Sequence, residues 1–224
     1  MLGVPVRSFR ENMVRCVEKE LIRLRSLLLE YANMETRFIA SLDPLPMPDM
    51  ESGVAVEIRT MISCGLSTGT GPMASVAGLF AQQVGKKLLE EYGLSEVMVE
   101  NGGDLYVRNV SGLLSVVHAG VSSLSDRLAF KIPAGEWGIC TSSGTMGHSF
   151  SRGKADAVTV ITHSAPLADA WATALANQLS SASDMDELLE TVAGIPEIRG
   201  FAAIIDDRMG ICGELEVKML TWDR

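Results

Sequence analysis

Apolar residues recur every three or four positions in several stretches of the chain, which is the spacing of one buried face of an α-helix. Residues 43–48 carry three prolines, so we interpret that segment as a linker between helices. We expect the second helix to end at Gly65 and a new one to begin at Pro72. The predicted helices cover about residues 11–32, 54–64, 72–88, 164–178 and 184–192.

The clearest strand signal is a hairpin within Val97–Val107. Two runs of strand-forming residues flank the sequence Asn101-Gly102-Gly103-Asp104. Glycine tolerates the positive φ that a two-residue turn requires, so this sequence predicts a tight turn. Further strands are predicted at residues 114–119, 128–132, 157–162, 201–205 and 209–212.

The order of the predicted elements repeats along the chain. Helix, helix, strand, acidic turn and strand occur in this order at residues 52–108 and again at 165–213. The repetition predicts an α+β fold built from a duplicated unit. We expect one domain over residues 1–224, with internal halves at about 1–135 and 136–224.

Small residues form a stripe along the predicted helix that follows Pro72, and they are Ala74, Gly78, Ala81 and Gly85. A glycine inside a helix costs roughly 1 kcal/mol relative to alanine. Close packing, a ligand or a homodimer interface against the stripe would explain these glycines. The preceding segment Gly65–Gly71 is predicted to be a glycine-rich loop, which either binds phosphate at a helix N-terminus or is an ordinary turn.

The net charge of −9 disfavours nonspecific binding to nucleic acid or to anionic membranes. The uncharged stretch Thr60–Gly85 is broken by glycine and proline, so it is not the apolar run of about 20 residues that crosses a bilayer. Residues 1–15 lack the apolar core of a signal peptide. The four cysteines include no CxxC pair and suit free thiols in the cytoplasm.

Asp169, Thr173 and Asn177 recur every four residues and therefore stack on one face of the helix that follows Ser164. Residues 155–183 contain no Lys or Glu, so we expect this helix to be buried nearly all round. A buried carboxylate costs on the order of several kcal/mol unless it is paired or metal-bound. Asp169 is therefore a candidate site residue. The alternative is that it lies near the start of its helix and is stabilised by the dipole.

Two other places carry candidate chemistry. Glu100 and Asp104 place two carboxyl groups at one tip of the hairpin, which is either a solvated end or part of a site. Residues 141–145 offer four hydroxyls and one glycine, which suit phosphate or ribose oxygens or form an ordinary Ser/Thr turn.

Four segments together resemble a known family. ENGGDLYV at residues 100–107 is similar to the NxGGD hairpin of the ApbE-like superfamily, and ADAWATALAN at 168–177 resembles its ADAxATAL helix. TSSGT at 141–145 resembles its TSG strand end, and GPMASVAGLFAQQV at 71–84 resembles the helix before the hairpin. The chain is closest to a short, uncharacterised branch of this superfamily, whose best-known members are Mg²⁺-dependent FAD:protein FMN transferases.

The resemblance implies tandem T-fold-like units, with antiparallel sheets and helix pairs packed on one face. It implies that Asp169 and Thr173 hold a metal ion together with the backbone carbonyl of Ala74, and such oxygen ligands suit Mg²⁺. It also implies that a dinucleotide such as FAD is bound by the hairpin turn and the TSSGT segment. The implied binding residues are Gly102, Gly103, Asp104, Thr141, Ser142, Ser143, Gly144 and Thr145.

The chain departs from the transferases at two points. Their HIxDPxTGxP segment has no counterpart beyond His148, and Ser75 stands where their helix-start lysine lies. We therefore expect a protein that binds a flavin or related dinucleotide with Mg²⁺ and acts, if at all, at the pyrophosphate. The sequence leaves open whether it is an enzyme. The alternatives are a non-catalytic binding module and an assembly protein that keeps the fold without FMN transfer.

Overall fold

The computed structural model describes residues 6–144 and 154–221. The α-helices are α1 (Val6–Met34), α2 (Arg37–Ala40), α3 (Val56–Thr68), α4 (Val76–Tyr92), α5 (Ala165–Ala176) and α6 (Met185–Ala193). Short 3-10 helices are η1 (Met50–Ser52), η2 (Pro72–Ser75) and η3 (Ala182–Asp184). The strands are β1 (Val97–Asn101), β2 (Asp104–Asn109), β3 (Leu113–Val116), β4 (Leu128–Ile132), β5 (Gly135–Ser142), β6 (Ala157–Thr162), β7 (Gly200–Ile205), β8 (Arg208–Gly213) and β9 (Val217–Met219).

The strands form two antiparallel sheets. The larger has six strands in the order β1-β2-β5-β6-β7-β8, and the smaller has three in the order β3-β4-β9. Every residue of the central strands β6 and β7 is buried, because both faces of the larger sheet are covered. The predicted α+β class is therefore confirmed.

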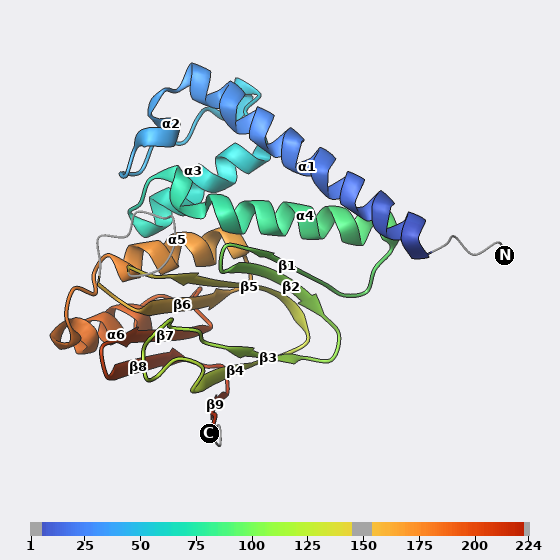
Figure 1. Ribbon diagram of the computed structural model, residues 1–224. Coiled ribbons are helices and arrows are strands. Elements are labelled where there is room, and N and C mark those ends of the chain that lie inside the picture. The colour runs from blue at the N-terminus through green and yellow to red at the C-terminus, as the bar shows by residue number, and fades with distance from the viewer. Residues whose placement is uncertain (1–5, 145–153, 222–224) are drawn as a thin grey trace.

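The molecule is layered, as Figure 1 shows. Helices α4, α5 and α6 cover one face of the six-stranded sheet, and the three-stranded sheet lies on the other face. Helices α1 and α3 lie farther out and pack on α4 and α5. Large apolar side chains fill each of the three interfaces, among them Tyr106, Leu175 and Phe201 under the helices, Phe130, Trp137 and Ile161 between the sheets, and Leu28, Phe38 and Met61 in the outer helical layer.

The predicted order of elements is present twice in the structure. The first segment is α3, α4, β1 and β2, and the second is α5, α6, β7 and β8. Their strands belong to one continuous sheet, in which β5 and β6 lie between the two hairpins.

The hairpin predicted within residues 97–107 is confirmed. Asn101 of β1 pairs with Asp104 of β2, which leaves Gly102 and Gly103 as the two turn residues. Both glycines have positive φ, at 67° and 104°, a backbone conformation that side chains with a Cβ rarely adopt. The turn is therefore fixed by local chemistry.

The predicted end of the second helix at Gly65 is wrong, and so is most of the predicted loop over residues 65–71. Helix α3 continues to Thr68 and is ended by Gly69, whose φ is 74°. The carbonyl oxygen of Gly65 accepts the N–H groups of Gly69 at 2.9 Å and Thr70 at 3.1 Å. A Cβ on Gly65 would lie 2.6 Å from the Thr70 carbonyl oxygen, so this glycine allows a close approach and does not break the helix.

The two glycines of the predicted stripe, Gly78 and Gly85, both lie on α4 and face other parts of the same chain. A Cβ at Gly78 would lie 2.3 Å from the carbonyl oxygen of Ala165, and one at Gly85 would lie 2.3 Å from the Tyr106 ring. Close packing is thus the reason for these two glycines. A ligand or a homodimer interface at these positions is ruled out, since α5 and β2 already occupy the space.

The four cysteines are unpaired, as predicted. Among the helices of residues 6–144 and 154–221, none is both long enough and apolar enough to cross a membrane.

Candidate functional site

The first turn of α4 meets the β1–β2 hairpin turn, the end of β5 and α5. The Asn101 side-chain amide donates to the Ala77 carbonyl oxygen at 3.2 Å, which ties the hairpin to α4. A Cβ on Gly103 would lie 3.7 Å from the Thr141 carbonyl oxygen, so the turn lies beside the end of β5. We call this region the acidic site, and its residues are Ala77, Gly78, Asp104, Cys140, Thr141 and Asp169.

Asp169 links α5 to the N-terminus of α4. Its Oδ2 accepts the backbone N–H of Gly78 at 2.9 Å, and its carboxyl group also accepts the N–H of Ala77. These are the two amides that the side chain of an N-cap residue normally accepts. Ser75 stands at the N-cap position but its Oγ donates to the Pro72 carbonyl oxygen at 2.9 Å instead. Asp169 therefore caps α4 from a different helix, and the dipole that favours its charge is that of α4.

A second side chain makes the reverse contact. Gln82 of α4 accepts the N–H of Ala165, the first residue of α5, at 3.0 Å. Ser164 stands at the predicted N-cap position of α5 but makes no capping bond with its side chain. Each of the two helices thus supplies an acceptor for the N-terminus of the other. This exchange fixes where α5 places Asp169.

Asp104 begins β2 and lies opposite Cys140 of β5. The pKa of Asp104 is raised to about 7, chiefly by burial and also by the charge of Glu100. Hydrogen bonds from the Cys140 thiol and the Thr141 N–H act in the opposite direction on this pKa. The Cys140 Sγ also lies 3.3 Å from the Ala165 carbonyl oxygen, so one thiol proton serves two acceptors.

Asp104 and Asp169 form a pair of buried carboxyl groups, each 9% exposed. Burial, and then the charge of Asp104, raise the pKa of Asp169 well above its ordinary value, although the Gly78 and Ala77 amides lower it. Within residues 6–144 and 154–221, neither acid forms a salt bridge with a basic side chain. Burying two such charges is unfavourable, so the pair either retains a proton or binds a cation.

The neighbouring thiols are neutral at neutral pH. Burial, with the charge of Asp169 as the second cause, raises the pKa of Cys64 to about 12. Burial also raises the pKa of Cys140 well above its usual value, and the charges of Asp104 and Asp169 add to this effect. A thiol ligates metal as the thiolate, and these raised pKa values make the two thiols poorer ligands than the oxygen atoms here.

The oxygen donors near Asp169 fit a hard cation such as Mg²⁺. Thr173 follows Asp169 by one helical turn and is half-buried, and η2, which carries Ala74, packs against α5. No cluster of three His, Cys, Asp or Glu side chains suited to a metal ion occurs in the described part of the chain. Hydroxyl, carbonyl, water or phosphate oxygens would therefore have to complete the coordination of a metal here.

The structure places some of the other predicted binding residues beside Asp104 and buries another in the sheet. Gly102 and Gly103 lie at the hairpin turn beside Asp104, and Thr141 lies next to them with its Oγ1 2.9 Å from Thr159 Oγ1. Ser142 is buried in the sheet, where it pairs with Val158.

The remaining predicted residues follow β5 or lie at the end of α5. The Gly144 N–H donates to the Ala155 carbonyl oxygen at 2.9 Å, and Ser143 precedes it after the end of β5. Thr145 and His148 lie outside the described residues. Asn177 is the C-cap of α5, one position beyond the helix that carries Asp169 and Thr173.

Sequence reasoning missed Asn101, Gln82 and Cys140. Cys140 directly precedes the TSSGT segment, and this adjacency was the only local signal for it. Its position opposite Asp104 depends on the register between β2 and β5, which no local pattern shows.

Comparison with known proteins gives a family match and distant structural likenesses. Residues 2–192 match the family described as AbpE bacteria. A UPF0280 protein of Methanococcus maripaludis is 35% identical over 207 residues, which cover 90% of this chain and 82% of that protein. The apo form of Pseudomonas stutzeri flavinyl transferase ApbE is 18% identical, with a TM-score of 0.45 over 64% of this chain and 50% of that one. Flavin transferase ApbE from Vibrio cholerae is 17% identical, with a TM-score of 0.43 over 89% and 74% of the two chains.

Proposed function

This chain belongs to the family described as AbpE bacteria, and from that premise we propose that it binds a flavin dinucleotide such as FAD together with Mg²⁺ at the acidic site. The observation that carries the proposal is the pair Asp104 and Asp169, two buried acids without a basic partner in residues 6–144 and 154–221. A divalent cation would offset the unfavourable charge of this pair. In the proposal, Asp169, Thr173 and the carbonyl oxygen of Ala74 hold the ion.

A Mg²⁺ ion in this place supplies positive charge that stabilises negative charge on a phosphate. The chain's own groups would do the rest of the binding. The backbone at Gly102 and Gly103 and the end of β5 at Thr141 would contact the dinucleotide. The pKa of Asp104 is about 7 without a ligand, and a bound cation would favour its charged form. A reaction, where one occurs, would be cleavage at the pyrophosphate.

A non-catalytic binding module is the second candidate, because the chain lacks most of one segment of the transferases. The DPxTG part of their HIxDPxTGxP segment is missing from this sequence. FMN transfer to protein is therefore not part of the proposed function.

The repeated order of elements supports a further proposal, that the single domain arose from two T-fold-like units with halves near residues 1–135 and 136–224. The four unpaired cysteines support a location in the cytoplasm.

Thermal unfolding with and without Mg²⁺ plus FAD tests the ligand. A ligand that binds only the folded state stabilises it by mass action, so the wild type should gain melting temperature when both are added. Asp169→Asn keeps an oxygen that can accept the Gly78 N–H but removes the charge, and it should lose most of this gain. Asp207→Asn, in the exposed turn before β8, is the matched control and should keep it.

Two results would count against the proposal. An equal gain in Asp169→Asn would remove this carboxylate from the ligand set. No gain in the wild type, and no flavin mass in compounds that co-purify with it, would exclude FAD as the ligand.

A further inference from the structure

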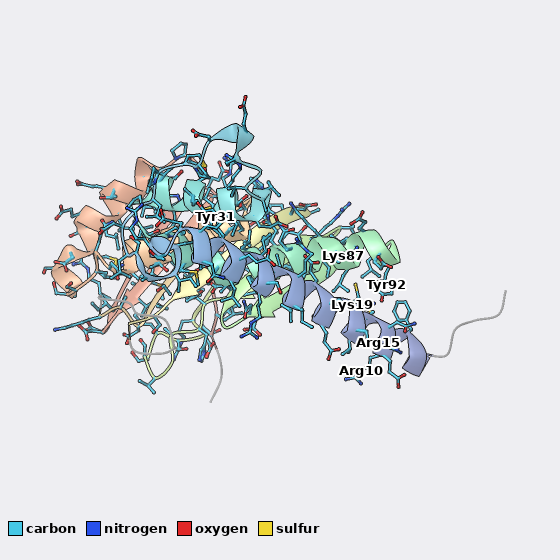
Figure 2. All side chains as sticks on the ribbon, turned by 90° about the horizontal axis from the view of Figure 1, so that it is seen from above. Arg10, Arg15, Lys19, Tyr31, Lys87 and Tyr92 are labelled. Carbon is cyan, nitrogen blue, oxygen red and sulfur yellow. The ribbon has the colours of Figure 1, made fainter. Side chains whose placement is uncertain are left out.

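The outward face of α1 carries a seam of residues with coiled-coil spacing. The helix forms the outermost layer of the molecule, as the view from above shows (Figure 2). Along its exposed side, positions separated alternately by four and three residues line up, which is the spacing that keeps one seam facing a partner helix. The seam residues are Glu11, Arg15, Glu18, Ile22, Arg25 and Leu29.

No part of the described chain covers the apolar residues of this seam. Ile22 is 65% exposed and Leu29 is 58% exposed, and Val14 on the flank of the seam is 49% exposed. The opposite side of α1 is already buried through residues such as Leu24, which is 0% exposed, and Leu28, which is 6% exposed. The exposed apolar residues are therefore not needed to attach α1 to its own fold.

The two charged residues at the centre of the seam also have no ion-pair partner. Glu18 and Arg25 are exposed, and neither forms a salt bridge within residues 6–144 and 154–221. They have opposite signs and flank Ile22 at similar distances along the helix, four residues before it and three after. A partner helix that matches them must present the same charges in the reverse order.

A second copy of α1 in antiparallel orientation has that order. With a two-fold axis between Leu21 and Ile22, each Glu18 faces Arg25 of the other copy, the two Ile22 side chains lie beside the axis, and each Leu29 faces Val14. A parallel pair would instead place Glu18 against Glu18 and Arg25 against Arg25, which is unfavourable. We propose that this face of α1 is the interface of a homodimer with antiparallel α1 helices.

The proposed interface is separate from the other features of α4 and α5. The two glycines of the stripe on α4 face other parts of the same chain, and the acidic site lies between α4, α5 and the sheet, whereas α1 packs on the outer side of α4 (Figure 1). Dimerisation can therefore be measured independently of ligand binding.

Sedimentation equilibrium of the full chain and its variants tests the interface. The wild type should be a dimer, and Ile22→Glu should be a monomer, because two buried carboxylates would lie beside the axis. Glu18→Arg and Arg25→Glu should each weaken dimerisation roughly tenfold, since each reversal changes two symmetric pairs. The double variant carrying Glu18→Arg and Arg25→Glu should recover the wild-type affinity, and so should an equal mixture of the two single variants.

Val121→Glu is the matched control, because Val121 is fully exposed at 102% and lies on a distant loop, and this variant should remain a dimer. Circular dichroism checks that every variant is folded. A monomeric wild type would overturn the proposal. A dimer that survives Ile22→Glu would place the interface elsewhere, and a double variant as weak as the single ones would exclude the antiparallel register.

Discussion

The carboxylate of Asp169 accepts the backbone N–H of Gly78 at 2.9 Å, across 91 positions of sequence. The contact joins a side chain of α5 to the first turn of α4. It is possible because Gly78 has no Cβ, which would otherwise lie 2.3 Å from the Ala165 carbonyl oxygen and 3.0 Å from the Asp169 Cβ. One residue pair thus explains both an unusual glycine in a helix and the position of a buried acid.

Replacing Asp169 in two ways should separate its capping role from its charge. Asp169→Ala leaves the Ala77 and Gly78 N–H groups without their acceptor, which should cost about 1–3 kcal/mol of unfolding free energy. Asp169→Asn keeps an acceptor and removes a buried charge, so without ligand it should be at least as stable as the wild type. Urea denaturation of the three proteins measures the difference. Equal stability of the Ala and Asn variants would show that the cap has no energetic role.

Filling the close approach at Gly78 should be strongly destabilising. Alanine favours a helix over glycine by about 1 kcal/mol, but the added methyl meets backbone that cannot move freely. We expect Gly78→Ala to lose roughly 1–3 kcal/mol overall. Gly194→Ala is the matched control, because a Cβ there would lie 3.4 Å from its nearest neighbour, the Thr191 carbonyl oxygen. Similar denaturation midpoints for the two variants would mean that α4 and α5 can separate without cost.

The buried acid Asp104 should make the ligand-free protein less stable as the pH rises. Its pKa is about 7 in the folded chain and about 4 in an unfolded one. A group with a raised folded pKa contributes its full stability below about pH 4 and loses it as the pH rises through about 7. Relative to Asp104→Asn, the wild type should lose on the order of 2–4 kcal/mol across this range.

Urea denaturation in EDTA at about pH 5 and about pH 8 measures this loss, because these two values enclose most of the pH range over which the stability falls. The exposed Asp207→Asn variant should follow the wild type at both values. A constant difference between wild type and Asp104→Asn would show that Asp104 titrates as an ordinary surface acid.

Incubation with FAD and Mg²⁺ should separate an enzyme from a binding module. We expect the chain to bind FAD and to release AMP slowly or not at all. We also expect no detectable transfer of FMN to a peptide with the sequence Asp-x-x-Ser/Thr-Gly-Ala-Thr, the acceptor motif of the transferases that the chain resembles. The reason is that the DPxTG segment is absent from the sequence. Chromatographic measurement of AMP and FMN-peptide over hours gives the answer. Rapid FMN-peptide formation that Asp169→Asn abolishes would contradict this expectation.

Local pattern determined most of the secondary structure of this protein. The strand at residues 157–162 and the two-residue turn at Gly102 and Gly103 follow from short-range chemistry, and the structure has them where they were predicted. The run of residues 155–183 without Lys or Glu correctly indicated that α5 is buried, and Asp169 with it. These features depend on neighbours a few positions away, so the sequence alone contains them.

The tertiary structure decided which of these elements meet. Sequence spacing could not show that Gly65 lies inside α3. A glycine is needed there because the Thr70 backbone comes close to it, and that approach is a feature of the folded chain. It could not show that Asp104 lies opposite Cys140, since that pairing is set by the register of β2 and β5. Nor could it show that Asp169 caps α4 or that Gln82 accepts the first N–H of α5. Each of these hydrogen bonds joins two helices that only packing brings together. Periodicity determines which face of an element is buried, whereas the partner of that face depends on how distant segments pack.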